Sequence, residues 1–113
     1  MKRVDAKFKS RVYEIVAQIP KGKVMTYGQV AAQAGAAWAS WEVGQIAHSG
    51  PSNLPWQRVV NKNGGLARGY TAGGYAAHKR DLEADDVFVD ENYRVDLEKL
   101  LWQPPVKGQR SLL

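Results

Sequence analysis

The sequence predicts a single domain that is mostly α with a small β component and that is winged helix-turn-helix-like. Three observations support this prediction. The chain has 113 residues, enough for one hydrophobic core and too few for two. Its first half carries apolar side chains at helical spacing in three segments, of which the last two are short and separated by a turn. Its second half contains short β-branched runs beside turn sequences, which favour strands.

The two helices nearest the N-terminus have the clearest signals. Apolar residues recur at helical spacing over residues 6–19, and Pro20 ends that predicted helix because proline lacks the N–H that a helix needs. Thr26 and Gln29 have the spacing of a capping box, so a short helix is predicted from about residue 27 to residue 34.

A third helix is predicted over residues 38–48, after Gly35 has closed the helix before it. Two short helices joined by a turn match the helix-turn-helix pattern, whose second helix enters a groove of DNA. Many small domains contain such a pair without any DNA role, so that simpler interpretation stays open. Trp41 lies on the outer face of the third helix, where it either meets a partner or packs against Trp38 or Trp56.

The second half is predicted to be less regular. Residues 61–65 are a strong turn signal, so residues 59–60 and 66–67 are expected to pair as a small hairpin or wing. The domain is expected to cover residues 1–105, with residues 106–113 as a disordered tail. A further helix, two strands and a terminal helical turn are predicted at residues 75–85, 87–89, 93–95 and 97–102.

Charge is distributed unevenly along the chain. The formal net charge is +5, but residues 1–80 carry 12 Lys and Arg against three acidic residues, whereas residues 81–113 carry four against eight. One basic and one acidic surface are therefore expected, as in a protein that binds a polyanion on one side. Scattered lysines on a solvated surface would give the same composition, so DNA binding does not follow from charge alone.

The composition excludes several classes of protein. The chain has no cysteine, which excludes disulfides, thiolate metal sites and a cysteine nucleophile. No apolar run approaches the roughly 18 residues of a membrane span, and the basic N-terminus is not followed by the apolar segment of a signal peptide. We therefore expect a cytoplasmic, nucleoid-associated protein with no membrane contact, no metal and no cofactor.

The stretch from Leu54 to Val60 has the features of a pocket wall. Pro55 fixes its own backbone and restricts the residue before it, so it makes a rigid bend in front of Trp56. Such a bend suits a side chain that must be held at a site. From the residues alone, Trp56 is more simply explained as a core aromatic, because large aromatic side chains mostly fill cores.

Four motifs, in this order and spacing, resemble the DNA-binding domain of the O6-alkylguanine-DNA alkyltransferases. The resemblance extends from about Phe8 to Leu82. It implies a helix-turn-helix domain whose recognition helix enters the minor groove. The motifs are Ile19-Pro20-Lys21-Gly22-Lys23-Val24, Thr26-Tyr27-Gly28-Gln29-Val30-Ala31, Val43-Gly44-Gln45 and Pro55-Trp56-Gln57-Arg58-Val59-Val60.

The pocket motif departs from that of the active enzymes in this family, which is Pro-Cys-His-Arg and whose cysteine accepts the alkyl group. Here Trp56 stands at the cysteine and Gln57 at the histidine. This replacement marks the alkyltransferase-like proteins, which bind alkylated guanine without repairing it and pass the lesion to nucleotide excision repair. The chemistry agrees independently, because alkyl transfer needs a thiolate and an indole cannot accept the group.

The resemblance also implies roles for residues that face DNA. Tyr27 matches a tyrosine that presses on the phosphate beside the target nucleotide, although a half-buried tyrosine at a helix start would explain it too. Trp41 occupies the position of the family's arginine finger and is expected to wedge between bases without that arginine's charge. The residues expected to bind DNA are Tyr27, Ser40, Trp41, Gly44, Gln45 and His48.

For the pocket, the resemblance implies a wall that holds a flipped base by stacking and apolar contact. Where the enzymes have a glutamate that completes the hydrogen-bond chain of the nucleophile, the resemblance places Arg80, as expected without catalysis. The lesion-binding residues are expected to be Trp56, Tyr70 and Arg68, supported by Pro55 and Arg58.

Together these features predict a non-enzymatic protein that binds duplex DNA, flips O6-alkylguanine into a tryptophan-containing pocket and flags it for nucleotide excision repair. The expected partners are double-stranded DNA containing O6-alkylguanine and excision repair proteins, and the protein is expected to be a monomer. Two alternatives stay open. One is a winged-helix regulatory module that has lost lesion recognition, which Trp41 at the finger position would explain, and the other is a protein-interaction domain with an acidic surface.

Overall fold

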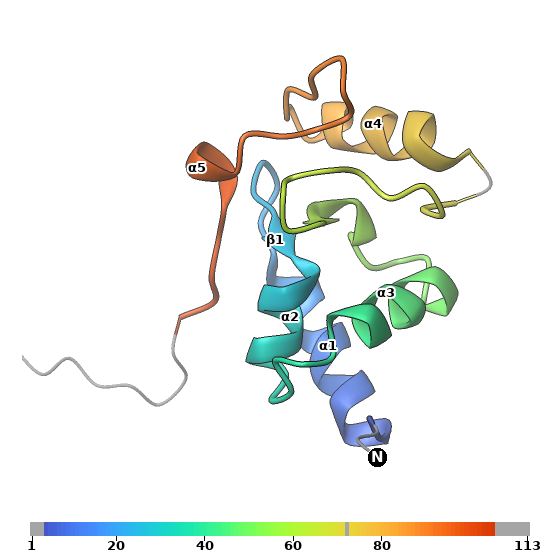
Figure 1. Ribbon diagram of the computed structural model, residues 1–113, viewed down its shortest axis with the longest axis vertical. Helices are drawn as coiled ribbons and strands as arrows, with labels where there is room; N and C mark the ends of the chain where they lie inside the picture. Colours follow the sequence, from blue (N-terminus) through green and yellow to red (C-terminus); the bar gives the residue numbers. More distant parts are fainter. Residues whose placement is uncertain (1–3, 72, 106–113) are drawn as a thin grey trace, which may run out of the picture.

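A computed structural model describes residues 4–71 and 73–105 (Figure 1). Helices dominate it and a two-stranded parallel sheet is the small β component, so the predicted fold class is confirmed. No helix in this described part is long and apolar enough to cross a membrane. The predicted tail, residues 106–113, lies outside the described residues. In chain order the elements are α1 (Ala6–Gln18), β1 (Met25–Thr26), α2 (Tyr27–Gln33), α3 (Ser40–Ser49), the 3-10 helix η1 (Trp56–Arg58), β2 (Val59–Val60), α4 (Gly74–Ala84) and α5 (Leu97–Leu100).

Helix α1 forms where the apolar spacing predicts it. The carboxylate of Asp5 caps the helix by accepting a hydrogen bond from the backbone N–H of Phe8 at 2.9 Å. The inward side chains, among them Val12 and Val16, are buried. The helix ends two residues before Pro20, because a proline ring disfavours the helical conformation of the residue before it.

Helix α2 begins with the predicted capping box. The Thr26 hydroxyl accepts from the Gln29 N–H at 3.1 Å, and the Gln29 side-chain oxygen accepts from the Thr26 N–H at 3.0 Å. Two N–H groups that the first turn leaves unpaired are satisfied in this way. After the helix, Gly35 has φ of +98°, a conformation that side chains other than hydrogen disfavour, and the chain can turn toward α3.

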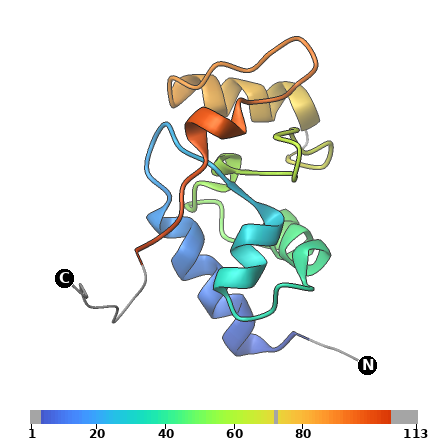
Figure 2. The same ribbon diagram turned by 60° about the vertical axis from the view of Figure 1, so that its left-hand side comes forward.

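Helix α3 begins later than predicted. The sequence predicts a helix from residue 38, but the first helical residue is Ser40, because Ala39 has φ of −101° and ψ of 32°. The N–H of Ala39 closes a turn onto the carbonyl of Ala36 at 2.8 Å, which leaves Trp38 in that turn. Helix α3 packs against α2, and α2 packs against α1 (Figure 2). This is the arrangement that the helix-turn-helix pattern predicts.

The predicted hairpin between residues 59–60 and 66–67 is wrong. Strand β2 pairs instead in parallel with β1, about 34 positions earlier in the chain. The turn over residues 61–65 does form, but the N–H of Leu66 then bonds to the carbonyl of Tyr93 at 3.0 Å. Burial is the physical reason, because both residues of β2 are fully buried and a solvent-facing wing would expose one of them.

The strands predicted at residues 87–89 and 93–95 are also wrong, since the described residues form no strand there. The backbone folds instead into a turn around the carboxylate of Asp90, which accepts from the N–H groups of Asn92 at 2.8 Å and Arg94 at 3.0 Å. The alternation that suggested a strand is real, because Val87 and Val89 are buried. These two buried side chains hold a loop against the core and do not belong to a β-strand.

The predicted helix near residues 75–85 and the terminal helical turn both form, as α4 and α5. The hydrophobic core has two parts. One lies among α1, α2, α3 and Trp56, and the other lies under α4 and the segment that follows it. The small sheet stands between them, because Met25 and Val59 belong to the first part whereas Val60 belongs to the second. Figures 1 and 2 show the same division, with α1 to α3 at one end of the molecule and α4 at the other.

Candidate nucleic-acid interface

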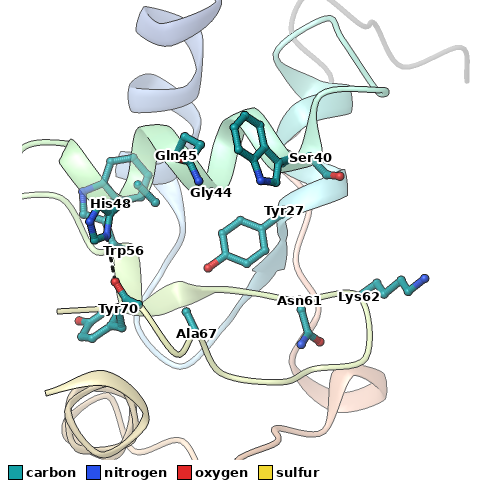
Figure 3. A pocket seen from close by; sticks show the side chains of 13 residues that line it. Tyr27, Ser40, Gly44, Gln45, His48, Trp56, Asn61, Lys62, Ala67 and Tyr70 are labelled. Atoms are coloured by element: carbon teal, nitrogen blue, oxygen red, sulfur yellow. Dashed lines mark hydrogen bonds between the residues drawn. The ribbon is translucent and has the colours of Figure 1, made fainter. Parts of the chain in front are cut away.

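A cavity of about 760 Å³ opens between α3 and the loop of residues 61–70 (Figure 3). Its size suits a nucleobase or a small ligand. Five residues that the sequence did not predict also line it: Ala47, Asn61, Lys62, Ala67 and Gly69. The predicted site residues that line it are Tyr27, Ser40, Trp41, Gly44, Gln45, His48, Trp56 and Tyr70.

Trp56 is both a core residue and a wall of the cavity. It is 9% exposed and packs edge-on against Tyr13, with ring centroids 6.1 Å apart. Its indole Nε1–H donates to the carbonyl of Pro51 at 2.8 Å, which fixes the ring. A Cβ at Gly50 would lie 2.6 Å from the indole, so the glycine permits this close approach. The interpretation of Trp56 as a core aromatic and its interpretation as a pocket wall are therefore compatible.

Tyr27, the first residue of α2, points its hydroxyl into the space between α3 and the loop (Figure 3). Its side chain is half-buried, and burial raises the pKa of the phenol, so the hydroxyl keeps its proton at neutral pH. A protonated hydroxyl can donate to a phosphate oxygen. Its placement suits the predicted phosphate contact and also fits the simpler interpretation of a half-buried tyrosine at a helix start.

Helix α3 presents an aromatic side chain and a small residue along the rim of the cavity. Trp41 is 69% exposed, so most of its indole is in solvent rather than packed against Trp38 or Trp56. Gly44, one turn later, has open space around it, since a Cβ there would meet no atom within 4 Å. Another surface can therefore approach the helix backbone closely at this point.

Hydrogen bonds within the loop opposite α3 fix the conformation of that loop. The side-chain oxygen of Asn61 accepts from the N–H groups of Asn63 and Gly65, both at 2.8 Å. On the side of α3, His48 Nδ1 lies 3.1 Å from the carbonyl of Gly69, so that nitrogen carries the proton and donates (Figure 3). The loop is thus tied directly to the helix across the cavity.

The far side of the loop rests on α4. The Tyr70 hydroxyl donates to the carboxylate of Asp81 at 2.6 Å, and its ring stacks on His78 with centroids 4.3 Å apart. His78 is fully buried, and burial lowers the pKa of its imidazole. Its Nδ1 accepts from the Ala67 N–H at 3.0 Å, so its Nε2 carries the proton and donates to the carbonyl of Gln57 at 2.9 Å.

Arg58 joins three segments below the cavity. Its guanidinium makes two hydrogen bonds to the Asp85 carboxylate, at 2.8 and 3.0 Å, and a third to the Ile19 carbonyl at 2.8 Å. Asp85 is 6% exposed, and its hydrogen bonds with Arg58 lower the pKa of its carboxyl. Arg58 therefore fixes η1, which carries Trp56, to the ends of α1 and α4.

Arg80, which the resemblance places at the enzymes' glutamate, bonds to Asp81, and the carboxylate that bonds to the pocket motif belongs to Asp85. Gln57, which stands at the histidine of the enzyme motif, donates from Nε2 to the carboxylate of Asp85 at 3.2 Å. Arg80 is exposed and contacts Asp81 instead, at 3.3 Å. A carboxylate is thus present behind the pocket motif, although 28 positions separate it from Gln57 in the sequence.

Three predicted site residues lie outside the cavity lining. Pro55 directly precedes η1, and Arg58 is the last residue of η1 and bonds to Asp85. Arg68 is exposed and does not line the cavity. The sequence offers a signal for Asn61, through its turn motif, but none for the part that His78 and Asp85 play, because their partners are distant in the chain.

Known proteins match both the sequence and this geometry. Residues 7–87 match the model of the family described as 6-O-methylguanine DNA methyltransferase, DNA binding domain. The chain is 38% identical over 104 residues to the DNA base-flipping protein of Escherichia coli (strain K12), covering 90% of this chain and 78% of that protein. It is 33% identical over 108 residues to Alkyltransferase-like protein 1 of Schizosaccharomyces pombe, covering 90% and 99%. The chain belongs to the alkyltransferase-like family.

The fold agrees with this membership. The S. pombe protein Atl1 in complex with damaged DNA containing O6-carboxymethylguanine has a TM-score of 0.81 to this structure at 30% identity, covering 90% of this chain and 100% of that one. No cysteine occurs in the family domain of the present chain. Its relatives identify this chain as a non-enzymatic alkyltransferase-like protein, and the absence of an acceptor cysteine from the domain is consistent with this.

The buried histidine of this alkyltransferase-like protein makes its stability pH-dependent. Below the ordinary pKa of 6.5 the unfolded chain binds a proton at His78, whereas the folded chain keeps the imidazole neutral down to its lowered pKa. The free energy of unfolding is therefore expected to fall as the pH decreases from 6.5, by up to about 1.4 kcal/mol per pH unit. Urea denaturation at pH 7.5, 6.5 and 5.5 measures it. The same pH dependence in His78→Asn would contradict this origin.

Gly44 offers a test of the helix face that separates stability from binding. Gly44→Ala is expected to stabilise the isolated protein by up to about 1 kcal/mol, because glycine is unfavourable inside a helix and the site is open. The same methyl group is expected to weaken duplex binding several-fold, because it stands on the rim of the cavity. Thermal unfolding and duplex titration check the two effects. An unchanged affinity for the duplex would show that this face of α3 does not contact DNA.

Proposed function

We propose that this alkyltransferase-like protein is a non-enzymatic sensor of alkylated DNA. It binds duplex DNA through the exposed face of α3, receives an O6-alkylguanine in the cavity beside Trp56 and holds it without chemical change. The observation that carries the proposal is an open cavity next to that helix face, walled by an indole at the position of the enzymes' acceptor cysteine. The complex of the S. pombe relative with damaged DNA containing O6-carboxymethylguanine supports it.

The side chains around the cavity supply the roles that base flipping requires. Tyr27 presses on the phosphate beside the target nucleotide, and Trp41 enters the space that the nucleotide leaves, since an apolar wedge can unstack a base step. Trp56 and Tyr70 then offer aromatic faces to the extruded base. Lys62 adds a positive charge at the rim, where a phosphate would lie.

Titration of two duplexes that differ only in one O6-methylguanine tests this function. The measurement is made at one moderate salt concentration, because phosphate contacts make every affinity salt-dependent. The lesion duplex is expected to bind more tightly. Equal affinities would defeat the proposal, and so would transfer of a methyl group to the protein detected by mass spectrometry.

The second candidate function is a DNA-binding or regulatory module without lesion recognition. The observation in its favour is that Trp41, 69% exposed, stands where the resemblance places an arginine finger, so the hydrogen bonds of that arginine to the orphaned base are lost. A duplex with a fluorescent base analogue at the target position separates the two candidates. Extrusion raises its fluorescence when the sensor binds, whereas a module that only docks on the duplex leaves the signal unchanged.

We further propose that the protein acts in the cytoplasm on nucleoid DNA and as a monomer, and that, once bound, it marks the lesion for nucleotide excision repair. The reason for the link to repair is that a protein that holds a lesion but lacks an acceptor needs a second system to remove it. Incision of a lesion duplex by a purified excision repair system is expected to increase when the protein is added. Unchanged incision would contradict the link to repair.

A further inference from the structure

The loop of residues 67–70 forms one wall of the cavity and is held by contacts with His48, Asp81 and His78. Ala67, Gly69 and Tyr70 of this loop line the cavity. On the side away from the cavity, the backbone of Ala67 donates to His78, and the ring of Tyr70 stacks on the same imidazole. His78 therefore contacts two of the three cavity-lining residues of the loop, while it does not line the cavity itself.

The same side chain also contacts the segment that forms the other wall. The second nitrogen of His78 donates to the carbonyl of Gln57, the residue directly after Trp56. One fully buried imidazole thus connects the segment that carries the indole to the loop that carries Tyr70. Because an imidazole is rigid and both nitrogens are used, His78 links the two walls directly through one ring.

We propose that His78 is a positioning residue for lesion recognition, which sets the distance between Trp56 and Tyr70 without touching DNA. This inference rests on the proposed function, since it assigns the two walls to an extruded base. A base held between two aromatic walls is bound well only at one spacing, so the residue behind the walls determines preference for the lesion rather than affinity for the duplex. The hydrogen bonds of His78 go to Ala67 and Gln57, so a change at this position is expected to leave the cavity-lining face of α3 in place.

Two variants of this residue separate its two hydrogen bonds, and both also remove the ring on which Tyr70 stacks. In His78→Asn the side-chain oxygen replaces Nδ1 as the acceptor for Ala67 but the bond to the Gln57 carbonyl is lost. In His78→Gln the side-chain amide replaces Nε2 as the donor to Gln57 but Ala67 loses its acceptor. Each variant gives up one buried hydrogen bond and the same ring stacking, so the two are matched controls for general destabilisation.

The experiment measures dissociation constants for an O6-methylguanine duplex and its undamaged counterpart with wild type and both variants, together with urea denaturation. In His78→Gln, which removes the acceptor of the Ala67 N–H, the lesion preference is expected to fall by about tenfold, because that N–H is left unpaired. In His78→Asn the preference is expected to fall less, and the undamaged duplex is expected to bind both variants as it binds wild type.

The outcomes separate this inference from the proposed function. Equal binding of the two duplexes by wild type would overturn both. A wild-type preference that His78→Gln retains would overturn the inference alone, as would equal losses on both duplexes that follow the losses in stability. If His78→Gln does not fold, a wild-type preference kept unchanged by folded His78→Asn overturns the inference, and a reduced preference supports it.

Discussion

Trp56→Ala is expected to abolish most of the preference for O6-methylguanine over guanine while leaving affinity for the undamaged duplex within a few-fold. Stacking of a base on an aromatic side chain contributes about 1–3 kcal/mol, so the affinity for the lesion duplex is expected to fall by about five- to 150-fold. The undamaged duplex does not place a base in the cavity and depends on phosphate contacts instead. Fluorescence anisotropy with the two duplexes measures both affinities.

The control for Trp56→Ala must account for the core. Trp56 is 9% exposed and its loss is expected to lower the free energy of unfolding by about 3–5 kcal/mol, so folding has to be verified by circular dichroism at the temperature of the titration. Trp56→Phe is the matched variant, because it keeps an aromatic face and loses the hydrogen bond to Pro51. It is expected to retain most of the lesion preference. An equal loss of affinity for both duplexes in the alanine variant would show that Trp56 does not contact the lesion.

Arg58→Ala is expected to cause the largest loss of stability of any single charged residue discussed above. It removes two hydrogen bonds from Asp85 and one from the Ile19 carbonyl, and it leaves a buried carboxylate without its cation. Breaking a buried ion pair in this way costs about 3–5 kcal/mol, and we expect the lower end because the guanidinium keeps 18% of its side-chain exposure. Urea denaturation at pH 7 measures the change.

The pH dependence of the same ion pair provides the control. Because the pKa of Asp85 is lowered in the folded state, its stabilisation is fully present above the ordinary pKa of 3.8 and is lost as the pH falls through the folded value. This window lies well below the one of His78. A double-mutant cycle with Asp85→Ala isolates the pair, and a coupling energy below about 0.5 kcal/mol would show that the two side chains act independently.

Local chemistry explains which parts of the fold the sequence predicts. The capping box of Thr26 and Gln29, the proline after α1 and the glycine after α2 each act within a few residues, so their effects are readable in order along the chain. The missing cysteine is equally local, because an absent nucleophile excludes alkyl transfer by this domain whatever the fold. The same holds for the rim residues of α3, which share one helix face.

The tertiary structure alone decided how the cavity is built. Val59 and Val60 look like half of a hairpin, yet burial on both faces pairs them with β1 rather than with the segment next along the chain. Likewise, Asp85 and His78 contact the pocket motif across 27 and 21 positions, through hydrogen bonds that burial strengthens. The sequence therefore determined which chemistry is absent and which helix faces outward, whereas long-range packing determined the walls, because contacts between distant segments leave no periodic trace in the chain.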